Sequence, residues 1–68
     1  MINGTIVMVK HDKGYGFING EDGREYFFHK DDMSDKSVYF AHIEVGSRVE
    51  FEPKPTPKGF RAANVDVV

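Results

Sequence analysis

The stretch KGYGFINGEDGREYFFH, residues 13–29, places two short aromatic runs on either side of the sequence EDGR. The Asp-Gly pair at positions 22–23 is a strong local signal for a tight β-hairpin turn. We therefore expect antiparallel strands over residues 15–20 and 25–29. The first strand alternates large rings with glycine, although glycine weakens a strand interior. Both the rings and the glycines therefore need an explanation.

Successive side chains of a strand point to opposite faces, so this hairpin has two alternative inner faces. One arrangement buries Ile18, Tyr26 and Phe28. Its outer face then carries four ring side chains, Tyr15, Phe17, Phe27 and His29. The reverse arrangement would bury a histidine and expose Ile18 and Phe28, which costs more free energy. We expect the first arrangement.

A ladder of exposed rings on paired strands is a surface on which bases stack, at about 1–3 kcal/mol per base. Bases in a duplex are already stacked on one another, so the surface favours single strands. We expect Gly14 and Gly16 to let a nucleotide approach the backbone beside Tyr15, because glycine has no Cβ. In the alternative interpretation the rings form a satellite core beneath residues 30–46. Two rings on one strand and a ring–histidine pair on the next, beside Lys13, favour binding.

The rest of the chain consists of short extended segments. We expect further strands over residues 2–10, 47–52 and 60–67. The sequence PKPTPKG, residues 53–59, predicts an extended polyproline-like loop without a regular ladder. Residues 30–46 predict a long connection with a single helical turn around Asp31 to Met33.

Five short strands favour an all-β, antiparallel Greek-key barrel of the OB-fold type, and an SH3-like barrel is the competing fold. The 68 residues are expected to form a single domain, 1–68.

Composition narrows the class of protein. The net charge of −2 argues against a bulk basic nucleic-acid binder but leaves room for a local basic face. The absence of cysteine and of a long apolar run predicts a cytoplasmic protein without disulfides or a membrane span. His11, His29 and His42 match no familiar metal-site spacing, so we expect no metal and no cofactor. No nucleophile with a base at readable spacing and no phosphate-binding loop is present, so an enzyme is not expected.

Two motifs carry a family resemblance. KGYGFI (13–18) resembles the RNP1 motif and YFFH (26–29) resembles RNP2, with GTI (4–6) upstream and AANV (62–65) near the end. Over nearly its whole length the chain is similar to the bacterial cold-shock domain. RRM domains share RNP1 but need two amphipathic helices, which are not readable here. The resemblance implies a five-stranded OB-type barrel that binds single-stranded RNA or DNA with low sequence specificity. It also implies an RNA chaperone that melts weak secondary structure, with a role in transcription or translation for some members.

The resemblance assigns binding roles position by position. Tyr15, Phe17, Phe27 and His29 would stack on bases, Lys13 and Lys58 would lie beside phosphates, and either Tyr39 or Phe40 would supply the aromatic of the long loop. Lys10 adds positive charge to this face.

The chain departs from the family pattern at Met8, Val9 and Lys30, where the family usually has aromatic residues. Met8 can still pack against a base, and Lys30 can contact a phosphate. Phe60 and Arg61 would offer a compensating ring and cation. We therefore expect binding to be retained but weaker or differently tuned, and to depend more strongly on salt concentration for each base held.

Two questions stay open from the sequence. The reduced set of rings and the negative charge leave an alternative, an OB-type module that binds a protein or peptide. The residues also do not separate RNA from DNA preference. A monomer is the default expectation for the oligomeric state.

Overall fold

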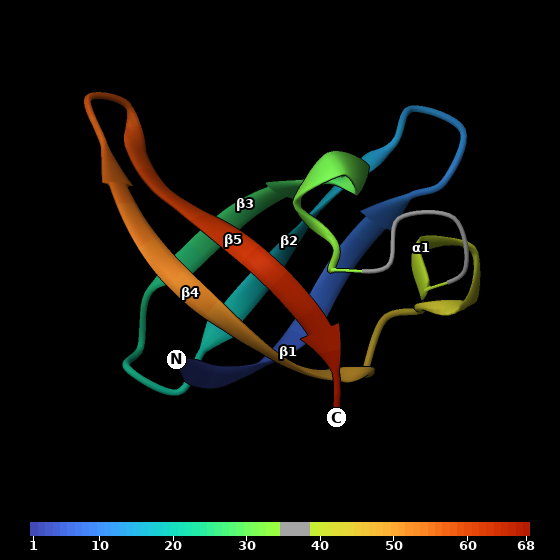
Figure 1. Ribbon diagram of the computed structural model, residues 1–68, viewed down its shortest axis with the longest axis horizontal. Helices are drawn as coiled ribbons and strands as arrows, with labels where there is room; N and C mark the ends of the chain where they lie inside the picture. The colour runs from blue at the N-terminus through green and yellow to red at the C-terminus, as the bar shows by residue number, and fades with distance from the viewer. Residues whose placement is uncertain (35–38) are drawn as a thin grey trace.

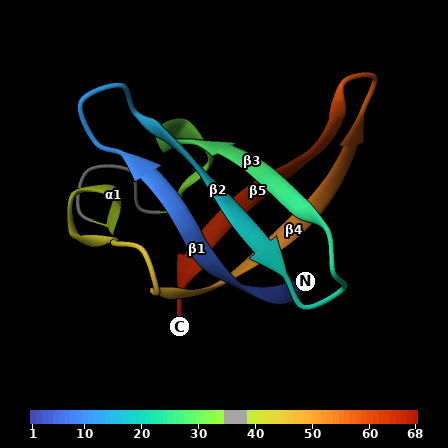
Figure 2. The same cartoon turned by 180° about the vertical axis from the view of Figure 1, so that it is seen from behind.

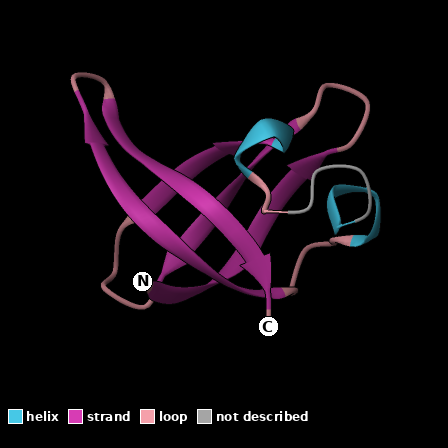
Figure 3. Ribbon diagram, in the orientation of Figure 1, coloured by secondary structure: helices cyan, strands magenta, loops and turns pink. Residues whose placement is uncertain are grey.

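The computed structural model describes residues 1–34 and 39–68, and for Tyr39 the backbone alone. Two short helical segments occur in this part, the 3-10 turn η1 (Lys30–Asp32) and α1 (Tyr39–His42). The rest is dominated by five strands: β1 (Ile2–Lys10), β2 (Tyr15–Gly20), β3 (Glu25–His29), β4 (Arg48–Thr56) and β5 (Gly59–Val67). Figure 3 shows how little of the molecule is helical. No helix of the described part is long and apolar enough to cross a membrane.

The strands close into a barrel in the order β1-β2-β3-β5-β4. Neighbouring strands are antiparallel except β3 and β5, which pair in parallel through Phe27 and Arg61. Figure 1 shows β4 and β5 crossing the front of the barrel, and Figure 2, from behind, shows β1, β2 and β3. The predicted OB-type barrel is confirmed, and the predicted bounds of the first three strands agree with the structure.

The hairpin buries the expected face. Ile18, Tyr26 and Phe28 are fully buried, whereas Tyr15, Phe17, Phe27 and His29 are half-buried on the outer side. The Tyr26 hydroxyl donates a hydrogen bond of 2.6 Å to Asp22 Oδ2, which joins the strand to its own turn. Further core side chains come from the other strands, from α1 and from the residues that follow η1 and α1, and are Ile6, Met33, Phe40, Ile43, Val49, Phe51, Ala62 and Val65. The alternation argument therefore identified the outer face correctly.

The proline-rich segment differs from expectation. Residues 53–56 continue β4, and Pro53 and Pro55 lie opposite Ala62 and Phe60 of β5. The pairing of β4 with β1 ends at Phe51, so beyond it β4 has β5 as its only described neighbour. Prolines two apart lack their N–H groups on the same edge of the strand. That edge is free here, so the ladder to β5 forms, and the two strands extend as an arm from the barrel (Figure 1).

The role expected for the glycines beside Tyr15 is also wrong. Gly16 is buried, and a Cβ added to it would lie 2.5 Å from the Met8 carbonyl oxygen and 2.9 Å from Phe28 Cε1. Gly14 has a φ of +78° in the β1–β2 turn, and the Lys30 side chain lies beside it. The two glycines thus permit close strand packing and a tight turn, because their missing side chains point inward or against Lys30. They do not open space for a ligand.

Candidate nucleic-acid interface

Three rings form one cluster on the outer surface of β2 and β3. Phe17 pairs directly with Phe27, and Tyr15 pairs with His29. The ring centroids of Phe17 and Phe27 are 5.7 Å apart, those of Tyr15 and Phe27 5.8 Å, and those of Tyr15 and Phe17 6.5 Å. We call Tyr15, Phe17 and Phe27, with His29 at one end, the aromatic face. These contacts hold the rings in place while each remains partly exposed.

The β1 strand extends the aromatic face on one side. Met8 lies opposite Phe17 and Lys10 lies opposite Tyr15, after an irregularity in the register between Ile6 and Met8. The Met8 side chain is half-buried and Lys10 is exposed. The thioether is therefore at the position where it can contact a base next to Phe17, and the ammonium group lies beyond the rings.

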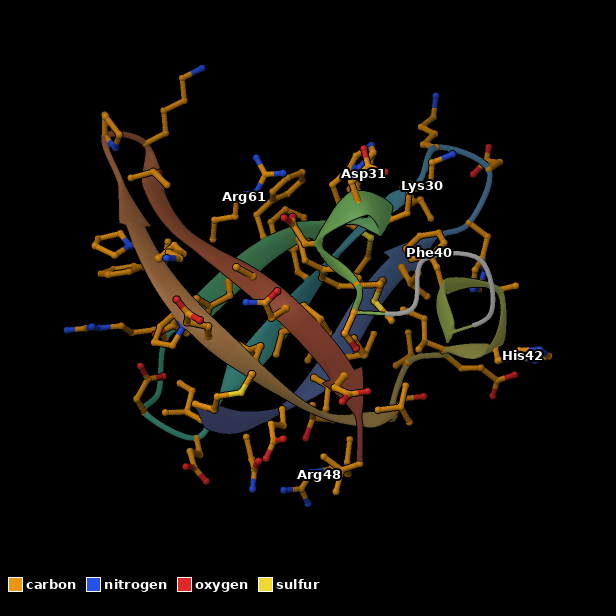
Figure 4. All side chains as sticks on the ribbon, viewed as in Figure 1. Lys30, Asp31, Phe40, His42, Arg48 and Arg61 are labelled. Carbon is orange, nitrogen blue, oxygen red and sulfur yellow. The ribbon has the colours of Figure 1, made fainter. Side chains whose placement is uncertain are left out.

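Two further cations border the aromatic face. Lys13 is exposed in the β1–β2 turn, and Lys30 is exposed directly after His29. The Lys30 stem lies close to Gly14, and its backbone N–H donates to the Gly14 carbonyl at 2.8 Å. Lys30 thus lies where the β1–β2 turn, which carries Lys13, meets η1, as its label in Figure 4 shows.

The side chains of Asp31, Asp32 and Arg61 form a network of hydrogen bonds and ion pairs beside His29. Its Nδ1 accepts a hydrogen bond of 3.1 Å from the Asp31 backbone N–H and lies 3.4 Å from Asp31 Oδ2. Asp32 Oδ2 accepts 2.9 Å from the His29 N–H and 3.0 Å from Arg61 Nε. These bonds form a capping box on η1 that fixes the ring plane of His29. Because Nδ1 accepts the Asp31 N–H, Nε2 is the ring nitrogen left to donate a hydrogen bond.

A groove adjoins Phe27 on the side of the β4–β5 arm. It has a volume of about 440 Å³ and is lined by Phe27, Thr56, Pro57, Lys58, Gly59, Phe60 and Arg61. Lys58 is exposed at the tip of the arm, and the Arg61 guanidinium lies 5.7 Å from the centre of the Phe27 ring. Figure 4 shows Arg61 between the arm and η1, which carries Lys30 and Asp31. The aromatic face therefore continues beyond Phe27 into a concave surface that Lys58 and Arg61 also line.

Phe40, one of the two residues expected to supply the aromatic of the long loop, belongs to the core. Phe40 has an exposed fraction of 6%, and its ring packs edge-on against Phe28 and His11 as part of the core. Its place in α1 brings the ring against the buried ring of Phe28. The side chain of Tyr39, the other residue proposed for that contact, lies outside the described residues.

Phe60 is likewise mainly a packing residue. Its ring lies 5.7 Å from that of Tyr26, and the Arg24 guanidinium lies over it at 4.5 Å. The expected compensating ring is therefore already covered, although the residue still borders the groove. Arg61, the expected compensating cation, does lie at the aromatic face.

The sequence predicted a helical turn around Asp31 to Met33 but no contact of Asp31 with His29 or of Asp32 with Arg61. The pair His29 and Asp32 has the spacing of a capping box but lacks its usual Ser/Thr and Glu/Gln, so the sequence signal is weak. In the described residues, no group of three or more His, Cys, Asp or Glu is arranged to hold a metal ion.

Comparisons with known proteins agree with this geometry. The family model described as the 'Cold-shock' DNA-binding domain matches residues 2–68. Cold shock protein 1 of Lactiplantibacillus plantarum is 42% identical over 65 residues, which cover 96% of each chain. The Retron Se72 cold shock-like protein of Salmonella heidelberg is 39% identical over 71 residues and covers both chains completely. Among solved structures, "drosophila Unr CSD456" matches with a TM-score of 0.77 and 26% identity, covering 98% of this chain and 26% of that one.

Proposed function

The chain belongs to the cold-shock domain family, a family of nucleic-acid-binding proteins, and we propose that it binds single-stranded RNA or DNA through the aromatic face and acts as an RNA chaperone. The observation that carries the proposal is the cluster of Tyr15, Phe17 and Phe27, packed on one another but outside the core. Three adjacent, partly exposed rings with cations at the border are suited to unpaired bases linked by phosphates.

The number of rings in the aromatic face sets the expected affinity for a single strand. Each stacked base contributes about 1–3 kcal/mol, so losing one ring raises the Kd by a factor of about 5 to 150. The rings touch one another, so deletion of one also loosens its neighbours and the losses are not additive. Sequence preference from stacking alone is weak because every base has a π-face.

Fluorescence anisotropy with labelled heptathymidine tests strand binding. The wild-type protein should bind the single strand and discriminate against the same strand annealed to its complement. Phe17→Ala and Phe27→Ala should each weaken binding, whereas Arg48→Ala, at the opposite end of the barrel (Figure 4), should leave it unchanged. Equal affinity for the duplex, or two ring variants that bind like wild type, would refute the assigned surface.

The proposed chaperone activity follows from the preference for single strands over duplexes. A protein that binds the open form of a hairpin stabilises that form by RT ln(1 + [L]/Kd), so weak stems open at micromolar protein. A short RNA hairpin with a fluorophore and a quencher at its ends should therefore brighten when wild-type protein is added, and much less with Phe27→Ala. If strands bind but the hairpin stays closed at saturation, strand binding stands and the chaperone role is wrong. The proposed setting is the cytoplasm, where unpaired transcripts are accessible to transcription and translation.

A further inference from the structure

Arg61 is held in a defined position beside the aromatic face. Its Nε donates to Asp32 Oδ2 at 3.0 Å, and the same oxygen accepts from the His29 backbone N–H at 2.9 Å. The Asp32 side chain has an exposed fraction of only 16%, and that of Arg61 is 45%. One end of the guanidinium is thus anchored to a carboxylate that is itself fixed by the backbone. Among the described residues, no further hydrogen bond of this guanidinium is found, and Arg61 and Phe27 both line the groove, with the guanidinium carbon 5.7 Å from the centre of the Phe27 ring.

The anchoring carboxylate changes what Arg61 is suited to bind. An arginine free of acidic neighbours attracts phosphate through its net charge. Here Asp32 offsets that charge, and Asp31 adds another exposed carboxylate nearby. The Arg61–Asp32 pair keeps the planar fork of N–H donors. It loses most of the attraction that a lone arginine has for a phosphate, whether monoanionic or dianionic. A neutral base edge with two adjacent acceptors is the matching partner. Lys58 and Lys30, which have no described ion-pair partner, are better placed to contact phosphates.

Guanine presents such an edge. Its O6 and N7 accept two parallel N–H groups, and the arginine–guanine pair is the commonest specific contact between proteins and bases. Adenine places a donor next to N7, and thymine and uracil carry single acceptors flanked by a methyl or an N–H group. Cytosine has two adjacent acceptors only on its Watson–Crick edge, and its small ring covers less of Phe27. The groove of about 440 Å³ admits a purine beside Phe27.

We propose that Arg61, positioned by Asp32, recognises the O6 and N7 atoms of one guanine bound in the groove beside Phe27. The inference rests on the proposed single-strand binding and adds one base-selective position to an otherwise tolerant surface. Arg61 is the residue that reads the base, and Asp32 is a positioning residue that acts through it. The chemical class selected is therefore a single strand with a guanine at one register, in RNA or DNA.

The test measures anisotropy for heptathymidine and for a series in which one thymidine is replaced by deoxyguanosine at each position in turn. At one position guanine should tighten binding about tenfold, within the range of about 5- to 150-fold that a bidentate contact supplies. Deoxyinosine, which keeps O6 and N7, should match guanine there. Adenine and 7-deazaguanine stack as well as guanine but lack the paired acceptors, and both should lose the gain.

The variants are compared through the ratio of the two dissociation constants, thymidine strand over guanine strand. Arg61→Lys keeps the charge but removes the fork, so the ratio should fall from about ten to near one. Asp32→Asn keeps an acceptor for the His29 N–H and removes the anchoring charge, so the ratio should fall while heptathymidine binds more tightly. Lys58→Gln, which removes a cation from the same groove, should weaken both strands equally and keep the ratio.

The results that would overturn this inference differ from the result that would refute the proposed function. Equal affinity for guanine and 7-deazaguanine at every position would overturn the inference, as would a preference for cytosine or an unchanged ratio in Arg61→Lys. In each of these cases heptathymidine still binds, so the proposed function survives. Failure of every strand to bind would instead refute the proposed function together with the inference.

Discussion

Gly16→Ala tests whether the glycines of the aromatic strand serve the barrel interior. The added methyl group would lie 2.5 Å from the Met8 carbonyl oxygen and 2.9 Å from Phe28 Cε1. The first contact is with backbone of the paired strand, so a rotamer change cannot relieve it. The second is with a fully buried ring, which has no free space to move into. The β1 and β2 strands must therefore separate locally, at the pair formed by Val9 and Gly16.

The expected cost is large for a chain of this size. Overpacking a well-packed core costs about 1–3 kcal/mol and occasionally more, and a clash with backbone belongs at the upper end. We therefore expect Gly16→Ala to lower the free energy of unfolding by about 3 kcal/mol. A 68-residue domain has a total of only about 3–10 kcal/mol. Urea unfolding followed by circular dichroism should show a much lower midpoint, with the folded fraction still binding heptathymidine.

Gly23→Ala is the matched control. A Cβ at Gly23 meets no atom within 4 Å, but its φ of +85° lies in the left-handed region. We expect it to cost about 1 kcal/mol through the backbone alone. A loss below about 0.5 kcal/mol for Gly16→Ala, or a stable variant that no longer binds strands, would refute the packing role. The latter result would restore the idea that this glycine makes room for a nucleotide.

Three further predictions concern other parts of the molecule. Lys30→Phe replaces an exposed cation next to His29 with a ring. In an anisotropy titration, this variant should bind heptathymidine about 5- to 150-fold more tightly than the wild type. Its affinity should also depend less steeply on salt concentration. Phe40→Ala removes a core ring, so it should lower the free energy of unfolding by about 3–5 kcal/mol. The fraction that stays folded should still bind heptathymidine. Unchanged stability together with lost binding would contradict this prediction. The hydrogen bond from Tyr26 lowers the pKa of Asp22, so the wild type should exceed Asp22→Asn in stability near neutral pH. That stability advantage should shrink as the pH falls below about 4 and passes through the lowered pKa of Asp22 in the folded state. Unfolding curves at several pH values measure it. An advantage that does not change with pH would contradict the lowered pKa of Asp22.

The predictable part of the fold came from local patterns. The Asp-Gly turn fixes the neighbouring strands, and alternation then leaves one choice of inner face, which the burial of Ile18 and Phe28 decides. The four side chains of the aromatic face follow from that choice without any tertiary information. This is why the aromatic face could be assigned from the sequence.

The parts that could not be predicted depend on neighbours far along the chain. The ladder through Pro53 and Pro55 depends on where β1 stops pairing with β4, which no local pattern records. Gly16 faces a carbonyl eight residues away on the partner strand, so its role is visible only in the register. The pairing of Asp32 with Arg61 spans 29 positions. Phe40 lies in a segment without a regular apolar period, so no local pattern shows that its ring joins the core.

The most direct test of the central claim is an amide and aromatic NMR titration of the labelled protein with heptathymidine. The account predicts that the largest shifts fall on Tyr15, Phe17, Phe27 and His29, with smaller ones along the groove. Residues at the opposite end of the barrel, such as Arg48, should not move. Shifts confined to that opposite end, or the same pattern produced by a duplex of equal length, would contradict the account.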